Sequence, residues 1–147
     1  MNAILFQYGL KEKHIKSDNN CLFHAIIDQC LQNGIIGWDH ISLRNASVKW
    51  LFENREKKVN NISLNELFDL NDNRLQQLLY HSIVWGDSST LFAMAQILNA
   101  KIIIYCSSSN IEEIISLKPY SYTFHIGYYH NIHYVSTTPY PKNNNLL

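Results

Sequence analysis

Cysteine is scarce in this 147-residue chain, which has three cysteines and no Cys-x-x-Cys spacing. An odd number of cysteines without paired spacing argues against a disulfide framework and against a zinc knuckle. The composition fits a reducing compartment, so we expect a cytoplasmic protein, or one in the host cytosol if its source is a pathogen or a virus. We expect no metal and no cofactor.

An excess of charge of either sign is also missing, because 12 basic side chains balance 12 acidic ones. A nucleic acid or an anionic membrane would need a clustered basic surface, so we expect neither as a partner. No apolar run approaches the length that spans a bilayer. The first six residues lack the basic region and the length of a signal peptide.

The composition of the chain indicates one folded domain. Hydrophobic residues make up 46% of the chain and charged residues 16%, which is typical of a globular protein. We expect an N-terminal segment over residues 1–16 with a charged connector at 11–16, a domain over 17–138 and a polar tail over 139–147. We expect the protein to be a monomer.

Helical patterns come first along the chain and strand patterns follow. The expected helices are one over 21–33, one capped by Ser42, a short one after Ser63, one capped by Asp72 and one capped by Asp87 or Ser88. The expected strands are 101–106, 111–117, 123–129 and 132–137, the last two forming a hairpin. This order predicts an α+β domain with helices packed on a small sheet.

The most informative stretch is Asp18-Asn19-Asn20-Cys21, a polar turn directly before a cysteine that opens an apolar-periodic helix. A thiol at a helix N-terminus meets free backbone N–H groups and the positive end of the helix dipole, which favour the thiolate. The turn can direct further N–H groups at an oxyanion, and we expect the Cys21 amide to donate with help from Asn19 or Asp18. The alternative is that the turn only caps the helix and that Cys21 is a core residue.

A candidate general base lies far downstream, at His133 in a strand-like run. A nucleophile and a base need to meet only in space, so a long separation in sequence is normal. Cys30 and Cys106 are expected in the core, and His130 in a solvated loop. A metal site from Cys21, His24 and His133 matches no common zinc spacing.

Three segments together resemble the ovarian-tumour (OTU) family of cysteine proteases, most of whose characterised members are deubiquitinases. They are the cysteine box from Asp18 to Phe23, the run Trp85-Gly86-Asp87 before a helix and an aliphatic strand, and the pair His133-Tyr134. The resemblance implies the OTU-like fold of the papain-like superfamily, a small central sheet between helices. It also implies that Cys21 is the nucleophile and His133 the base.

The function implied by the resemblance is thiol-dependent hydrolysis of the isopeptide or peptide bond after the C-terminal glycine of ubiquitin, or of a ubiquitin-like modifier. Ubiquitin or polyubiquitin is then the expected partner. Two alternatives stay open: an inactive or weakly active OTU-like domain that only binds ubiquitin, and a viral or parasite polyprotein protease of the same fold.

The sequence departs from the family pattern at the third member of the catalytic triad. Many family members carry Asp or Asn two residues after the histidine, where this chain has Val135, which cannot accept a hydrogen bond. Asn131 could orient the imidazole through its side-chain oxygen, and Asp18 is a second candidate. A Cys–His dyad without a third residue is the remaining possibility.

Overall fold

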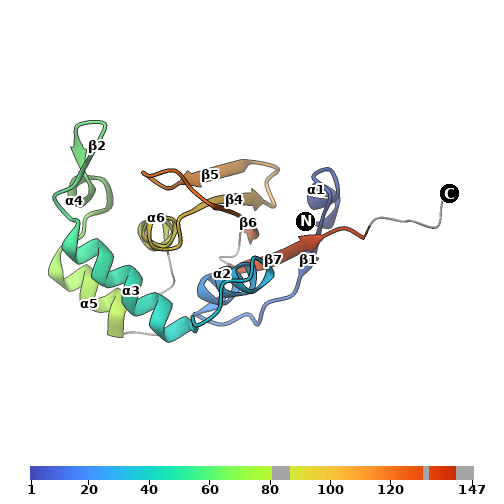
Figure 1. The fold of residues 1–147 in the computed structure, drawn as a ribbon, viewed down its shortest axis with the longest axis horizontal. Coiled ribbons are helices and arrows are strands. Elements are labelled where there is room, and N and C mark those ends of the chain that lie inside the picture. Colours follow the sequence, from blue (N-terminus) through green and yellow to red (C-terminus); the bar gives the residue numbers. More distant parts are fainter. Residues whose placement is uncertain (81–86, 131–132, 142–147) are drawn as a thin grey trace.

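The structure, a computed structural model, describes residues 1–80, 87–130 and 133–141, and its centre is a five-stranded mixed sheet (Figure 1). The strand order is β1-β7-β6-β4-β5, in which β4 and β6 are parallel and all other neighbours antiparallel. The strands of this sheet are β1 (Leu10–Lys13), β4 (Ala100–Cys106), β5 (Ile111–Ile115), β6 (Tyr122–Tyr129) and β7 (His133–Pro139). The helices are α1 (Asn2–Phe6), α2 (Cys21–Gln32), α3 (His40–Glu53), α4 (Leu64–Phe68), α5 (Asp72–Tyr80) and α6 (Ser88–Ile97).

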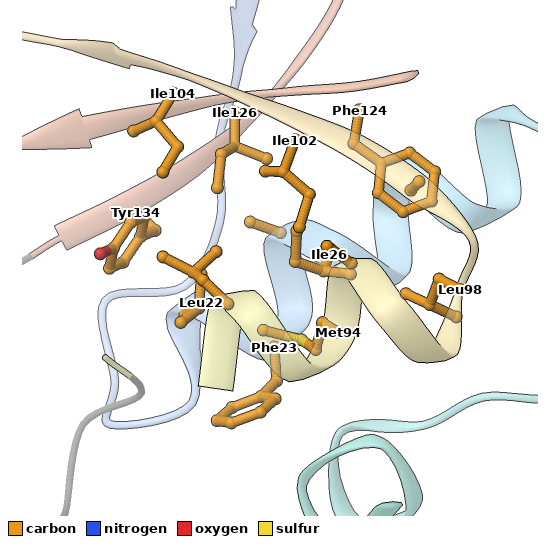
Figure 2. Packing of buried hydrophobic residues seen from close by; sticks show 14 of the residues in the cluster. Leu22, Phe23, Ile26, Met94, Leu98, Ile102, Ile104, Phe124, Ile126 and Tyr134 are labelled. Carbon is orange, nitrogen blue, oxygen red and sulfur yellow. The ribbon is translucent and has the colours of Figure 1, made fainter. Parts of the chain in front are cut away.

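The predicted α+β class is confirmed, and the sheet has helices on both of its faces. Side chains of α2 and α6 pack on the face formed by alternate residues of β4 and β6 (Figure 2). The labelled members of this cluster are Leu22, Phe23, Ile26, Met94, Leu98, Ile102, Ile104, Phe124, Ile126 and Tyr134. On the opposite face, Leu5 of α1 packs with Leu10 and Tyr105. No helix among the described residues is long and apolar enough to cross a bilayer.

A second apolar cluster joins α3, α4, α5 and α6 beside the sheet, and a small hairpin of β2 (Lys58–Val59) and β3 (Ile62–Ser63) precedes α4. The helix caps follow the sequence with two corrections, at α3 and at α5. The cap of α5 is Asn71, whose Oδ1 accepts a hydrogen bond from the Arg74 amide at 2.8 Å, whereas the predicted cap Asp72 is the first residue of the helix. Ser63 caps α4 and Asp87 caps α6, as predicted. The cap of α3 is Asp39, whereas Ser42 is its partner in a capping box, because the helix begins one turn earlier than expected.

The N-terminal segment supplies an edge strand where the sequence suggested only a charged connector. Lys11, Glu12 and Lys13 lie in β1 and pair with β7, with Glu12 opposite Thr137. The apolar periodicity of this segment is weak because Leu10 is the one buried side chain of β1 and backbone pairing with β7 provides the rest of its attachment. Charged side chains are also typical of edge strands, where they prevent further strand pairing.

A buried polar network attaches α2 to β7, the two elements that begin with Cys21 and His133. The Gln29 side-chain amide donates to Ser136 Oγ at 3.0 Å and to the Thr137 carbonyl at 2.8 Å. Ser136 Oγ in turn donates to Asp28 Oδ2 at 2.6 Å, and Lys13 Nζ lies 2.6 Å from Asp28 Oδ1. These directional contacts hold the helix at one position along the strand, which apolar packing alone would specify less sharply.

Replacing Asp28 by asparagine should therefore destabilise the protein in a pH-dependent way. Burial raises the pKa of Asp28, but hydrogen bonds from Lys13, Ser136 and Gln32 outweigh it, so the pKa is lower than in the unfolded chain. The stabilisation is then present above the unfolded pKa of about 3.9 and is lost as the pH falls through the folded pKa. We expect Asp28→Asn to lower the free energy of unfolding by about 1 to 2 kcal/mol at pH 7.

Urea denaturation of both proteins between pH 7 and pH 3 measures this difference. Asp72→Asn is the matched control, because it removes a carboxylate that also pairs with a cation but is 78% exposed. An exposed ion pair contributes little, so the control should unfold almost like the wild type. A difference between Asp28→Asn and wild type that stays constant down to pH 3 would contradict the prediction.

Candidate active site

The side-chain and backbone oxygens of Asp18 both accept hydrogen bonds within the turn before α2. The side-chain Oδ1 accepts a hydrogen bond from the Asn20 amide at 2.8 Å, and the carbonyl accepts one from the Cys21 amide at 3.2 Å. The first bond spans two residues and forms an Asx turn, which explains the aspartate at this position. Asn20 is the N-cap residue of α2, so the turn delivers Cys21 as the first residue of the helix.

The backbone amides of this turn differ in whether they already donate a hydrogen bond within the protein. The Asp18 amide donates to the Lys16 carbonyl at 3.0 Å, and the amides of Asn20 and Cys21 donate to Asp18. The Asn19 amide donates to no described residue. Of the donors expected for an oxyanion, Asn19 is therefore available directly, whereas Cys21 would share its hydrogen with the Asp18 carbonyl or release it.

The Cys21 side chain is fully buried, and its sulfur lies against β7. The Tyr134 amide donates a hydrogen bond to Cys21 Sγ at 3.4 Å. Burial raises the pKa of the Cys21 thiol above its ordinary value, and the Asp18 carboxylate raises it further. The amides of Tyr134 and Leu22 lower the pKa without offsetting burial, so the thiolate favoured by the helix N-terminus is not the resting state and a base is needed.

His133 is the first residue of β7 and directly precedes the amide that contacts the sulfur. Its ring stacks on Tyr129, its partner across the β6–β7 pair, with ring centroids 6.1 Å apart. The Nδ1 atom of His133 is buried and has no hydrogen-bond partner among the described residues, Cys21 included. The backbone of the predicted base thus lies beside the predicted nucleophile, with one ring nitrogen unoccupied; catalytic pairs are often looser without substrate.

The candidates for the third member of the triad are placed differently. Asn131 lies outside the described residues. The carboxylate of Asp18 is directed toward its own turn and toward His24, whose Nε2 lies 3.8 Å from Asp18 Oδ2. Val135 is buried and packs against Gly127, so it supplies no acceptor to the imidazole of His133.

The other two cysteines lie in the core, as predicted, and His125 contacts a tyrosine. Cys30 and Cys106 are buried, and burial raises the pKa of Cys30 to about 11. His125 Nδ1 is 2.9 Å from the hydroxyl of Tyr105, on the far side of the sheet from α2. Within the ranges 1–80, 87–130 and 133–141, no three Cys, His, Asp or Glu residues are grouped to hold a metal ion. The predicted Trp85-Gly86 anchor lies outside these ranges.

A cavity of about 310 Å³ is lined by Tyr134, by Cys106 at the end of β4 and by Tyr128 near the end of β6. The ring of Tyr134 packs on Tyr128, with centroids 4.7 Å apart. Polar side chains line the same space, among them Ser88 of α6, Glu112 of β5, and Ser108, Asn110 and His130 from the neighbouring loops. Tyr134 thus both lines this cavity and contacts the Cys21 sulfur through its backbone amide.

Arg44 was not predicted from the sequence; it is a buried arginine of α3 whose guanidinium contacts the turn before Cys21. Its position beside Leu43 at the buried side of the helix was the available signal, because a charged residue on an apolar stripe requires buried partners.

Comparison with known proteins gives the same family as the motifs. A model of the family "OTU-like cysteine protease" matches residues 16–140, which is most of the chain. The chain therefore belongs to the OTU-like cysteine proteases. OTU domain-containing protein 4 of Mus musculus is 39% identical over 57 residues, which are 39% of this chain and 5% of that protein. The human protein of the same name matches equally, so the chain spans a small part of the curated relatives it matches.

Solved structures confirm the fold. The OTU domain of OTUD1 superposes with a TM-score of 0.69 at 20% identity, over 93% of this chain and 91% of that one. An OTU domain in complex with ubiquitin gives a TM-score of 0.68 at 24% identity, over 88% and 69% of the two chains. An OTU deubiquitinase from Wolbachia pipientis wMel bound to ubiquitin gives 0.62 at 13% identity, over 90% and 98%.

Proposed function

We propose that this chain is a deubiquitinase, a thiol isopeptidase that hydrolyses the bond after the C-terminal glycine of ubiquitin or a ubiquitin-like modifier. The observation that carries the proposal is the hydrogen bond from the Tyr134 amide to Cys21 Sγ, which brings the start of α2 against the strand that begins at His133. Further support comes from the family match and from similar folds solved with ubiquitin.

In the proposed acylation step, His133 accepts the proton of the Cys21 thiol, and the sulfur attacks the carbonyl carbon of the terminal glycine. The carbonyl oxygen becomes an oxyanion, stabilised by the Asn19 amide and by the Cys21 amide once it releases the Asp18 carbonyl. The C–N bond then breaks, and the leaving amine takes the proton from the imidazolium. The products of this half-reaction are a thioester on Cys21 and a free amine.

In the proposed hydrolysis step, His133 takes a proton from a water molecule, which attacks the thioester carbonyl. The C–S bond breaks, the sulfur regains a proton from the imidazolium, and the glycine leaves as a carboxylic acid, which ionises by releasing its proton to solvent. The base is needed twice because burial keeps the pKa of the thiol high and because water is a poor nucleophile at neutral pH.

A ubiquitin probe with an electrophile at its C-terminus tests the proposal. We expect a stable adduct whose mass equals the chain plus the probe, with the linkage on Cys21 and on neither Cys30 nor Cys106. A ubiquitin-like modifier carrying the same electrophile identifies the modifier that the site prefers. Absence of any adduct would overturn the enzymatic assignment.

The second candidate function, a binding domain without activity, is favoured by two observations. Val135 leaves His133 without the usual acceptor, and burial holds Cys21 in the thiol form. Titration of Cys21→Ala with unmodified ubiquitin separates the alternatives: reversible binding combined with no adduct in the wild type would indicate a binding module.

The orienting group of His133 is testable by substitution. We expect Asn131→Ala to slow turnover by roughly ten- to a thousand-fold, the loss typical of an orienting hydrogen bond rather than of the base itself. The measurement is kcat with a fluorogenic ubiquitin substrate. Asp18→Ala is the comparison variant, because it removes both side-chain oxygens that could accept from the imidazole. An unaffected Asn131→Ala with a large loss in Asp18→Ala moves the role to Asp18, and small losses in both leave a dyad.

A further inference from the structure

We propose that Arg44 is a positioning residue of the active site, which holds the turn of residues 18–21 in the geometry that catalysis by Cys21 requires. The inference rests on the proposed function for its kinetic consequences, and its structural consequence can be measured without any activity. Arg44 lies in α3, outside the cysteine box and far from it in sequence.

Within the described part of the chain, the contacts of Arg44 join its own helix α3 to α5 and to the turn before Cys21. Its Nη2 lies 2.9 Å from Asn20 Oδ1 and 3.3 Å from the Asn19 carbonyl, both in the turn before Cys21. Its Nη1 donates to the Leu78 carbonyl at 2.9 Å, near the end of α5. The guanidinium also lies over the ring of Phe23, 4.4 Å from the centroid. One planar group thus links α3, α5 and the turn.

The burial of Arg44 makes these contacts energetically important. Only 5% of the residue is exposed, so its charge has lost most of its hydration. A buried cation is retained only where hydrogen bonds and an aromatic face replace water, and removing its partners is costly. Among the described residues, two carbonyl oxygens and an amide oxygen at 2.9 to 3.3 Å contribute to that replacement, and the Asn19 carbonyl and the Asn20 amide oxygen belong to the turn.

The effect on the turn follows from peptide geometry. In a trans peptide the C=O and N–H groups point in opposite directions, so holding the Asn19 carbonyl toward Arg44 directs the Asn20 amide away from it. That amide meets Asp18 Oδ1 at 2.8 Å. The Asn20 side chain makes no capping bond to α2 and instead accepts from Arg44. Arg44 therefore holds both the peptide and the side chain of the residue before Cys21.

Arg44→Gln tests the proposal, with Arg55→Gln as a matched control. Arg55, just after the C-terminal end of α3, also bonds a side-chain oxygen and a carbonyl and lies over an aromatic ring: 2.8 Å to the Asp72 carboxylate, 3.5 Å to the Leu70 carbonyl and 4.7 Å to the Phe52 ring centroid. None of these contacts involves the turn. The control thus measures the loss of an α3–α5 arginine without a change at the active site.

We expect Arg44→Gln to lower kcat on a fluorogenic ubiquitin substrate by roughly ten- to a hundred-fold while KM changes by less than about threefold, because a misplaced nucleophile slows chemistry more than binding. Hydrogen exchange of the Asn20 and Cys21 amides should become at least about tenfold faster. Arg44→Lys should recover part of kcat, since lysine restores the charge but not the planar fork. Arg55→Gln should change neither kcat nor exchange in the turn.

Asn20→Ala removes the hydrogen bond between Asn20 and Arg44 by changing the turn instead of the arginine. It remains informative if Arg44→Gln fails to fold. Its loss of kcat should not multiply with that of Arg44→Gln, so the double variant should resemble Arg44→Gln alone. Multiplying losses, unchanged exchange in Arg44→Gln, or an equal loss of kcat in Arg55→Gln would overturn the proposal. If the wild type does not cleave ubiquitin, the proposed function fails, and the exchange comparison alone decides whether Arg44 holds the turn.

Discussion

Cys21→Ala is expected to abolish cleavage of ubiquitin conjugates, with kcat falling at least roughly 10⁴-fold to the background rate. Alanine cannot form the thioester, and no other cysteine lies at a helix start beside β7. The substitution removes one buried atom from a site where the turn and helix are held by backbone hydrogen bonds, so the fold should persist. Ubiquitin binding should persist as well, and calorimetric titration measures it.

Cys30→Ala is the control for this experiment. Cys30 lies on the same helix, is equally buried and has a thiol whose pKa burial raises to about 11. Removing its sulfur leaves a small cavity in the core, which costs stability but no chemistry. Activity that survives in Cys21→Ala, or that disappears in Cys30→Ala at a temperature where the variant is folded, would show that Cys21 is not the nucleophile.

His133→Ala has the second-largest expected effect, a loss of kcat/KM of roughly 10³- to 10⁴-fold at pH 7. Without the imidazole, the thiolate must form by direct ionisation of Cys21. Because burial raises the pKa of that thiol, it stays protonated at pH 7, and its ionised fraction grows about tenfold with each pH unit until the raised pKa is reached. The variant should therefore regain activity steadily between pH 7 and pH 9.

The measurement is a pH profile of kcat/KM for the wild type and for His133→Ala. The wild-type profile should be much flatter over the same range, since its base already removes the proton. His125→Ala is the matched control: this half-buried histidine of β6 contacts Tyr105, and its loss should leave kcat/KM within about threefold. A His133→Ala variant that loses less than tenfold, or that shows no rise with pH, would assign the base to another group.

Much of the fold was predictable from the sequence because its signals are local. The helix that starts at Cys21, the buried aliphatic strand near 101–106 and the caps at Ser63 and Asp87 depend on a few neighbouring residues. The polar turn before the cysteine is similar, since an Asx turn needs only the side chain of Asp18 and an amide two residues later.

The group that orients the imidazole of His133 could not be identified from the sequence alone. Val135 excludes the usual acceptor from the residue type alone. Which oxygen replaces it depends on how residues far apart in the chain approach the ring, and the structure places the Asp18 carboxylate toward Asn20 and His24. Asn131 lies outside the described residues, so this role stays a prediction.

The sequence by itself determined the family, the α+β class and the residues that could carry the chemistry, because the motif segments are contiguous and their order is preserved. Only the tertiary structure decided the electrostatic state of Cys21, the strand β1 and the contacts of Arg44. Each of these depends on segments that are distant in sequence. Burial of the thiol requires β7 to lie against α2, and the turn is held by a guanidinium from α3 that no local pattern connects to it.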